Sequence, residues 1–111
     1  MWSFGCILIE LYTGIPIFPG ESEMEQLALI MQVFGVPPLS VLQNAERKDK
    51  FFSPGTNEPL NIFEDQDGGL RLPGSRPLVE IIGDQSETFF DFIVRCLDWD
   101  PEERITPYQA L

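Results

Sequence analysis

The first dozen residues are apolar on nearly every side of a helix. In residues 2–12 aromatic and aliphatic side chains dominate, and Glu10 is the one charged residue. The β-branched Ile7 and Ile9 leave a strand as the alternative, but the length of the run and the Gly14 that follows it favour a helix. A helix without a polar face is expected at the centre of a core.

A second helix is predicted to begin after Ser22. Residues 22–25 have the pattern of a capping box, in which the Ser22 hydroxyl accepts from an early helical N–H and the Glu25 carboxylate reaches back. Gly35 and the prolines at 37–38 end this helix. Its buried face is predicted from the apolar residues that recur at helical spacing, Leu27, Ile30, Met31 and Phe34.

The middle of the chain is poorer in apolar residues and rich in Gly and Pro. Residues 39–45 are predicted to form a short helix. Residues 46–85 are predicted to form a long irregular segment, with short extended pieces near residues 60–63. A loop of this length in a compact domain is usually functional or poorly ordered.

Two more helices are predicted near the C-terminus. Ser86 is the expected N-cap of the first, and Asp100 and Pro101 end it. Thr106 begins another capping box, with Pro107 at the first helical position. The apolar stripe of the first of these helices consists of Phe90, Ile93, Val94 and Leu97, widened by Phe89 and Cys96. The predicted fold class is therefore mainly α.

Composition narrows the functional classes. The chain has 111 residues, the size of one domain, and 43% of them are hydrophobic, which argues against general disorder. The formal net charge of -11 argues against nucleic-acid binding through a basic surface. The acidic charge suits contact with basic peptides, although a soluble acidic surface is the simpler interpretation.

The sequence contains no His, which excludes Ser-His-Asp and Cys-His nucleophilic catalysis and His-ligated metal sites. Cys6 and Cys96 lie among apolar residues and are predicted to be free, buried thiols of an intracellular protein. Residues 2–8 are apolar, but without a basic segment before them and with Glu10 close behind they form neither a signal peptide nor a membrane span. We therefore expect a cytoplasmic or nuclear protein with no membrane partner and no nucleic-acid partner.

Three stretches together resemble eukaryotic protein kinases. Residues 1–11 (MWSFGCILIEL) are similar to the kinase core helix F, whose signature is D-x-W-S-x-G; the family Asp would stand one position before Met1. Residues 13–20 (TGIPIFPG) resemble the loop between helices F and G. Residues 96–106 (CLDWDPEERIT) resemble the stretch L-x-x-D-P-x-x-R before the last helix. The order and spacing of the three make the joint resemblance specific, and it covers essentially the whole chain.

The resemblance implies a partial kinase large lobe, from helix F through helices G and H to the start of helix I. Residues 1–111 are then an incomplete protein kinase domain, and residues 37–85 are an insert typical of the CMGC kinase group. Residues 18–28 and 106–111 are most similar to dual-specificity tyrosine-regulated kinases (DYRK). MAP kinases and other CMGC relatives are the alternative subfamilies.

The phosphate-transferring motifs of the family are absent. The catalytic loop of the family needs H-R-D, and this sequence has no His. The D-F-G motif is also absent: the pair Asp91-Phe92 is followed by Ile93, not Gly, and lies inside a predicted helix. The only lysines, Lys48 and Lys50, lie in a predicted polar loop. Phosphoryl transfer needs those groups to position ATP, metal and acceptor. We therefore predict no catalytic, cofactor-binding or metal-binding residue here and no activity of the chain alone, while ATP and Mg²⁺ are implied for the whole kinase.

Three residues have roles implied by the resemblance. Arg104 matches the kinase Arg that pairs with the Glu of A-P-E and anchors the activation segment; the alternative is a surface Arg near Asp100 or Glu103, worth little energetically. Trp2 matches a Trp that packs beneath the activation segment, or is an ordinary core Trp. Glu10 matches an acidic residue that helps DYRK-like kinases hold a substrate Arg; the alternative is a carboxylate satisfied by the backbone or by another Arg, since an unpaired buried carboxylate is costly.

The expected function is that of a piece of a protein serine/threonine kinase that acts on protein substrates. The alternative is a non-catalytic interaction module that binds a partner through helix G and the insert. The apolar face of residues 24–34 is a candidate docking surface, with packing against helix F as the simpler interpretation, and residues 51–52 are either a docking element or a local core. Without the loops that cover it in a whole kinase, the apolar helix at residues 2–12 is predicted to leave a large exposed patch.

Overall fold

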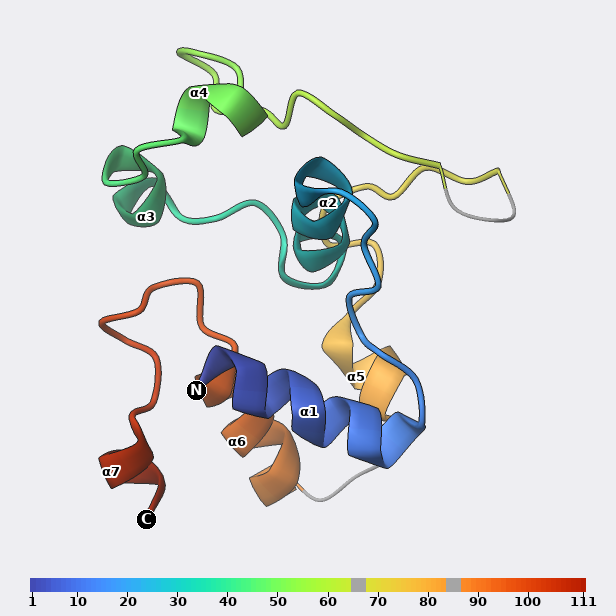
Figure 1. Cartoon of the computed structure of the whole chain (residues 1–111), viewed down its shortest axis with the longest axis vertical. Coiled ribbons are helices and arrows are strands. Elements are labelled where there is room, and N and C mark those ends of the chain that lie inside the picture. Colours follow the sequence, from blue (N-terminus) through green and yellow to red (C-terminus); the bar gives the residue numbers. More distant parts are fainter. Residues whose placement is uncertain (65–67, 84–86) are drawn as a thin grey trace. The chain divides into compact units, whose positions relative to one another are not determined.

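A computed structural model describes residues 1–64, 68–83 and 87–111. Every regular element in these residues is a helix, which confirms the predicted mainly α class. The helices are α1 (Trp2–Thr13), α2 (Glu23–Phe34), α3 (Leu39–Gln43), α4 (Lys48–Phe51), α5 (Leu78–Ile82), α6 (Glu87–Cys96) and α7 (Pro107–Ala110) (Figure 1). Among the described residues, no helix has the length and apolarity needed to cross a membrane.

The chain divides into two compact units. The first combines Met1–Ile17 with Val79–Leu111, and the second comprises Phe18–Leu78. The first unit therefore joins the two ends of the sequence, while the second contains α2 together with most of the segment predicted as an insert.

The core of the first unit lies between α1 and α6, which Figure 1 shows side by side. Ile9 of α1 and Ile93 of α6 are fully buried. Gly5 permits the close approach of the two helices, since a Cβ at this position would lie 2.8 Å from the Cβ of Cys96. The predicted helix at residues 2–12 is confirmed.

The other sides of α1 are exposed. Only Gly5 and Ile9 of this helix are buried, and Leu11 is 77% exposed. The prediction that α1 is surrounded by core is therefore wrong for this chain, because α6 and the residues near it cover one side only. The predicted exposed apolar patch is present, and it contains Phe4, Ile7, Leu11 and Tyr12.

The second unit is built around α2. Its N-cap is Ser22, whose hydroxyl accepts from the N–H of Glu25 at 3.1 Å, as predicted. The reciprocal half of the capping box is wrong, because the Glu25 carboxylate accepts from the N–H of Glu21 at 2.7 Å. The predicted buried face is correct only at Met31. The buried residues of α2 are Ala28, Leu29, Met31 and Val33.

The predicted insert contains more helix than expected. Its first helix, α3, ends two residues earlier than predicted. The predicted loop that holds Lys48 and Lys50 is wrong, because both residues belong to the helical turn α4. The helix α5 was not predicted, since five residues give too few periodic positions to reveal it. Pairing between extended segments is limited, in the described residues, to isolated bridges, Phe52 with Pro59 and Glu64 with Leu70, and residues 60–63 belong to no assigned strand.

The last two helices follow the prediction closely. The expected N-cap Ser86 lies outside the described residues, and α6 begins at Glu87. Val94 is exposed, so the predicted stripe of α6 is wrong at this position. The capping box of α7 is confirmed in both directions, with the Gln109 N–H donating to Thr106 Oγ1 at 3.1 Å and the Thr106 N–H donating to Gln109 Oε1 at 3.0 Å.

Candidate functional site

Arg104 lies over the ring of Trp2 in the first unit. The guanidinium carbon is 5.3 Å from the centre of the ring, within the range of a cation–π contact. The Arg104 Nε–H donates to the carbonyl of Asp98 at 3.0 Å, and Nη2 donates to the carbonyl of Trp99 at 3.4 Å. The side chain is thus held in one orientation by two carbonyl oxygens and an aromatic face.

The turn that presents these carbonyls is stabilised by its own carboxylates. Asp98 Oδ1 accepts from the N–H of Asp100 at 2.9 Å, and Asp100 Oδ1 accepts from the N–H of Glu102 at 2.9 Å. Such short side-chain bonds to the following backbone are the reason that Asp favours turns. The Arg104 guanidinium forms no ion pair with any carboxylate in the part of the chain that the structure describes, Asp100 and Glu103 included.

Trp99 completes this arrangement. Its ring centre is 6.1 Å from that of Trp2, at an interplanar angle of 36°. The Trp99 Nε1–H is buried and has no hydrogen-bond acceptor among the described residues. A buried donor without a partner costs about 1–3 kcal/mol. We call Trp2, Trp99 and Arg104 the Trp–Arg cluster.

Glu10 lies apart from the Trp–Arg cluster. It is on the same helix as Trp2 but eight positions further along, about 12 Å at the rise of an α-helix. Its carboxylate is exposed and forms no ion pair within the described ranges. The structure therefore brings Trp2 and Arg104 together and leaves Glu10 as a separate charge on an apolar surface.

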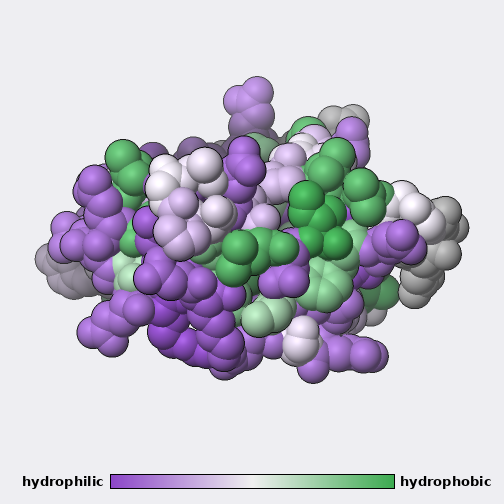
Figure 2. Space-filling model, turned by 90° about the horizontal axis from the view of Figure 1, so that it is seen from above, coloured by the Kyte–Doolittle hydropathy of each residue, from purple (hydrophilic) through white to green (hydrophobic). Residues whose placement is uncertain are grey.

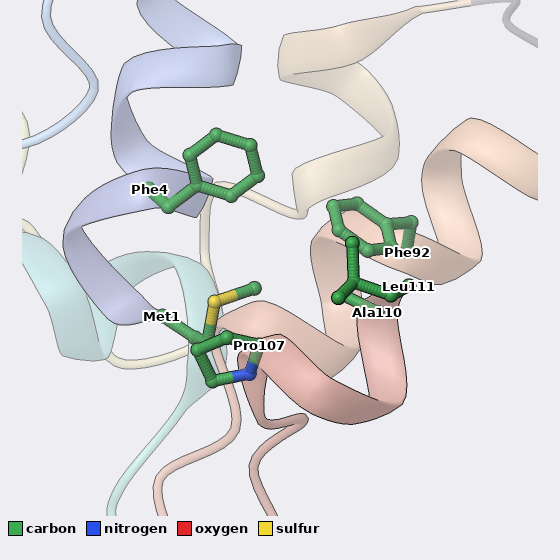
Figure 3. Close-up of a pocket in the computed structure, with 6 residues that line it drawn as sticks. All are labelled: Met1, Phe4, Phe92, Pro107, Ala110 and Leu111. Carbon is green, nitrogen blue, oxygen red and sulfur yellow. The ribbon is translucent and has the colours of Figure 1, made fainter.

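An apolar pocket of about 390 Å³ opens beside the start of α1. Figure 3 shows Phe4 and Met1 on one side, with Pro107 of α7 beside Met1, and Phe92 of α6 on the other side, with Ala110 and Leu111 beside it. The rings of Phe4 and Phe92 are 6.3 Å apart and nearly perpendicular. The lining is apolar, so this pocket offers no group for acid–base or metal chemistry.

Ionic contacts of the second unit were not predicted from the sequence. Glu23 pairs with Arg47 at 2.6 Å and with Lys50 at 3.2 Å, and hydrogen bonds from both lower the pKa of the Glu23 carboxyl to about 2. Glu25 and Arg71 form a more sheltered pair at 3.2 Å. The partners are 24 to 46 residues apart in sequence, so no local pattern reveals them.

No metal centre is formed by the described residues. They contain no group of three or more His, Cys, Asp or Glu side chains that could hold a metal ion. Asp91, in the Asp-Phe-Ile sequence, is on the surface of α6 and pairs with Arg95 at 3.1 Å.

A family model described as "Protein kinase domain" matches residues 1–111, so the chain belongs to the protein kinase domain family. Among its relatives are DYRK kinases, which confirms the resemblance. Dual specificity tyrosine-phosphorylation-regulated kinase 2 of Drosophila melanogaster is 49% identical over 99% of this chain and 15% of its own length. The kinase 4 of the same name from Homo sapiens is 49% identical over 100% of this chain and 21% of its own length.

A third relative is the DYRK-family kinase pom1 of Schizosaccharomyces pombe, which is 47% identical over 99% of this chain and 10% of its own length. The chain therefore spans about a fifth or less of these curated relatives.

Proposed function

We propose that this chain forms the helical base of the large lobe of a DYRK-like protein serine/threonine kinase. Residues 1–111 are part of the kinase domain, and residues 37–85 are its CMGC insert. The complete kinase binds ATP and Mg²⁺ and transfers the γ-phosphate to protein substrates. Two findings support this proposal: the whole chain matches the kinase domain family, and its sequence is 49% identical to two DYRK kinases.

The Trp–Arg cluster is the observation that carries the proposal. Two carbonyls and the Trp2 ring orient Arg104, yet no carboxylate of the described residues pairs with it. A guanidinium fixed in this way is suited to a charge-assisted bond with a carboxylate. We assign Arg104 and Trp2 the anchoring of the activation segment, with Arg104 bound to the segment's Glu. The Trp99 Nε1–H, which has no acceptor in the part of the chain that the structure describes, supports the idea that further polypeptide covers the cluster.

Glu10 has a separate role in the proposal. Its exposed carboxylate projects from a helix whose neighbouring exposed side chains are apolar, Ile7 and Leu11 among them. A free carboxylate in such surroundings attracts a guanidinium. We assign it contact with an Arg of the substrate peptide.

The chain alone is proposed to be inactive, because its sequence has no H-R-D and no D-F-G. The test is incubation of the purified 111-residue chain with labelled ATP, Mg²⁺ and a generic Ser/Thr peptide. No label above that of a heat-treated sample is expected. Incorporation that rises with the amount of chain contradicts the proposal.

The anchoring role is tested in a kinase domain that includes this chain. Arg104→Ala removes a bond between charged groups, so kcat is expected to fall roughly 10- to 100-fold, and the activation segment is expected to become more sensitive to protease. Arg95→Ala is the matched control, because Arg95 is exposed and forms an ion pair with Asp91 on its own helix. Equal activity and protease sensitivity in the two variants contradict the anchor.

The substrate contact is tested with two peptides that differ only in one Arg. Glu10→Gln keeps the size of the side chain and removes its charge. KM is expected to rise for the Arg-containing peptide and to stay constant for the Arg-free one. A change that is the same for both peptides contradicts the assignment of Glu10.

A second function, docking of a protein partner, is favoured by exposed aliphatic side chains on the proposed insert. Figure 2 shows hydrophobic patches among largely hydrophilic residues on one face of the chain.

We also propose that the protein works in the cytoplasm or nucleus. The two cysteines, Cys6 and Cys96, are free, as expected in a reducing compartment.

A further inference from the structure

Two arms of the proposed insert run side by side in the second unit (Figure 1). Glu64 and Leu70 form an antiparallel bridge, and the N–H of Arg71 donates to the carbonyl of Phe63 at 2.8 Å. Successive side chains of extended backbone point to opposite faces, and directly opposed residues share a face. Even-numbered residues of the two arms therefore lie on one face and odd-numbered residues on the other. We call residues 61–64 and 70–72 the insert ribbon.

The odd-numbered face of the ribbon is turned towards α2. Asn61 donates from Nδ2 to the sulfur of Met24 at 3.2 Å. Arg71 pairs with Glu25 at 3.2 Å. These contacts fix which face is inward, and the odd-numbered positions are less exposed than their neighbours on both arms.

The even-numbered face carries exposed aliphatic side chains. Ile62, Leu70 and Leu72 are 46%, 54% and 46% exposed, and Leu60, at the bend that precedes the first arm, is 52% exposed. Exposed aliphatic residues scattered singly are ordinary, whereas a contiguous group rimmed by polar residues marks an interaction site. Here three of them share one face of a short ribbon, and Leu60 is close to them in sequence.

The rim of this face is acidic. Glu64 is exposed at the end of the first arm, on the same face, and Glu58 is exposed just before its start. Residues 51–70 contain four acidic residues and no Lys or Arg. Arg71 is drawn to the opposite face by Glu25. A ligand for this surface therefore needs aliphatic groups together with positive charge.

We infer that the even-numbered face of the insert ribbon docks a polypeptide segment in which aliphatic residues alternate with Lys or Arg. The apolar groups bury the aliphatic side chains of this face, and the basic groups meet the acidic rim. A second copy of this chain is a poorer occupant, because its own acidic rim would face the first. The inference rests on the docking role proposed for the insert, whereas the catalytic proposal stands without it.

The test uses a kinase domain that includes this chain and three short synthetic peptides. One alternates Leu with Lys, one replaces each Lys by Glu, and one replaces each Leu by Ser. Binding is followed by fluorescence anisotropy of labelled peptide at physiological salt. Only the Leu/Lys peptide is expected to bind. Comparable binding of the Ser/Lys peptide shows mere charge attraction and overturns the inference, and so does absence of binding by all three.

Substitutions locate the surface. Ile62→Ser with Leu70→Ser is expected to weaken binding of the Leu/Lys peptide roughly tenfold or more, since two apolar contacts are lost. The matched control is Leu39→Ser, at a residue 57% exposed on α3 and outside the ribbon. Glu64→Lys is expected to weaken binding several-fold. Glu46→Lys, at an exposed residue outside the ribbon, is expected to weaken it less. Equal losses of peptide affinity in the ribbon variants and their controls overturn the inference.

Two further measurements separate the remaining outcomes. Sedimentation of the unsubstituted protein shows whether a second copy covers the face; a dimer that Ile62→Ser with Leu70→Ser dissociates overturns the proposed partner. Phosphorylation of a generic Ser/Thr peptide without such a segment tests the kinase proposal independently. An active kinase that binds none of the peptides therefore removes the docking inference alone.

Discussion

Gly5 of α1 lies against Cys96 of α6 with no room for another carbon. An added Cβ would be 2.8 Å from the Cβ of Cys96 and 3.1 Å from a methyl of Leu97. Neither Cβ atom can rotate out of the way, because each is fixed by its own helix backbone. The spacing of α1 and α6 therefore depends on the missing side chain.

Gly5→Ala is expected to lower the free energy of unfolding. Overpacking costs about 1–3 kcal/mol, and the better helix propensity of Ala returns at most about 1 kcal/mol, so the balance is a loss. The measurement is thermal or urea unfolding of a kinase domain that includes this chain. Ser3→Ala, on the exposed side of the same helix, is expected to be neutral or slightly stabilising. A Gly5→Ala variant as stable as Ser3→Ala contradicts the close packing.

Trp99→Phe is expected to act differently in the 111-residue chain and in a kinase domain that includes it. In the chain alone, the substitution removes a buried N–H that has no acceptor among the described residues. This gain partly offsets the free energy of unfolding that is lost because the ring of Phe is smaller. If further polypeptide supplies an acceptor, the same change costs about 1–2 kcal/mol more in the kinase domain. Trp2→Phe serves as the control, since it weakens the cation–π contact with Arg104 in both proteins.

Unfolding of the two proteins is compared by urea titration. If Trp99→Phe lowers the free energy of unfolding by the same amount in both proteins, the rest of the kinase domain supplies no acceptor for the Trp99 N–H. This result weakens the proposed docking of the activation segment on Trp2 and Arg104, whatever the activity of the kinase.

Acid is expected to weaken the contact between α2 and α4 through Glu23. Hydrogen bonds from Arg47 and Lys50 lower the pKa of the Glu23 carboxyl from 4.5 to about 2. The pKa in the folded protein is below the unfolded value, so the stabilisation is present above pH 4.5 and is lost as the pH falls towards 2. The effect is small and decreases with added salt, because all three side chains are exposed.

This pH dependence is measured as the Tm of the unsubstituted protein and of Glu23→Gln over the same range. The difference between the two is expected to vanish at the acid end and to shrink in high salt. Glu46→Gln, an exposed change outside the three-residue contact, is expected to leave the unsubstituted profile almost unchanged. Parallel profiles for the unsubstituted protein and Glu23→Gln contradict the proposed coupling.

Local signals in the sequence were sufficient for the helix ends. Thr106 and Gln109 cap α7 as predicted, because both partners lie within one turn. Gly14 ends α1 with a φ of 83°, a conformation that favours glycine. The Ser22 cap of α2 was predicted for the same reason.

The sequence could not select the buried face of α2. In residues 27–34 only Gln32 is polar, so apolar side chains point in nearly every direction. Residues distant in sequence contact this helix, for example Gly74, whose N–H donates to the carbonyl of Met31 at 2.9 Å, and a local pattern does not show them. Long-range partners also explain why the sequence did not reveal the Glu25–Arg71 pair, or that Trp99 lies against Trp2.

The exposed face of α1 gives the last prediction. Leu11 is 77% exposed and Ile7 is 52% exposed, which leaves much apolar surface in contact with water. The isolated 111-residue chain is therefore expected to bind a hydrophobic dye such as ANS and to be poorly soluble. Ile7→Lys with Leu11→Lys is expected to reduce dye fluorescence and raise solubility, because it places charge on this face without touching the buried Ile9. Ser3→Lys is the matched control for added charge on α1 and is expected to leave most of the dye signal. Equal dye binding by the Ile7/Leu11 and Ser3 variants contradicts the prediction. A monomer with a sharp unfolding transition and no dye binding also contradicts it, because the exposed side chains would then be covered within the chain itself.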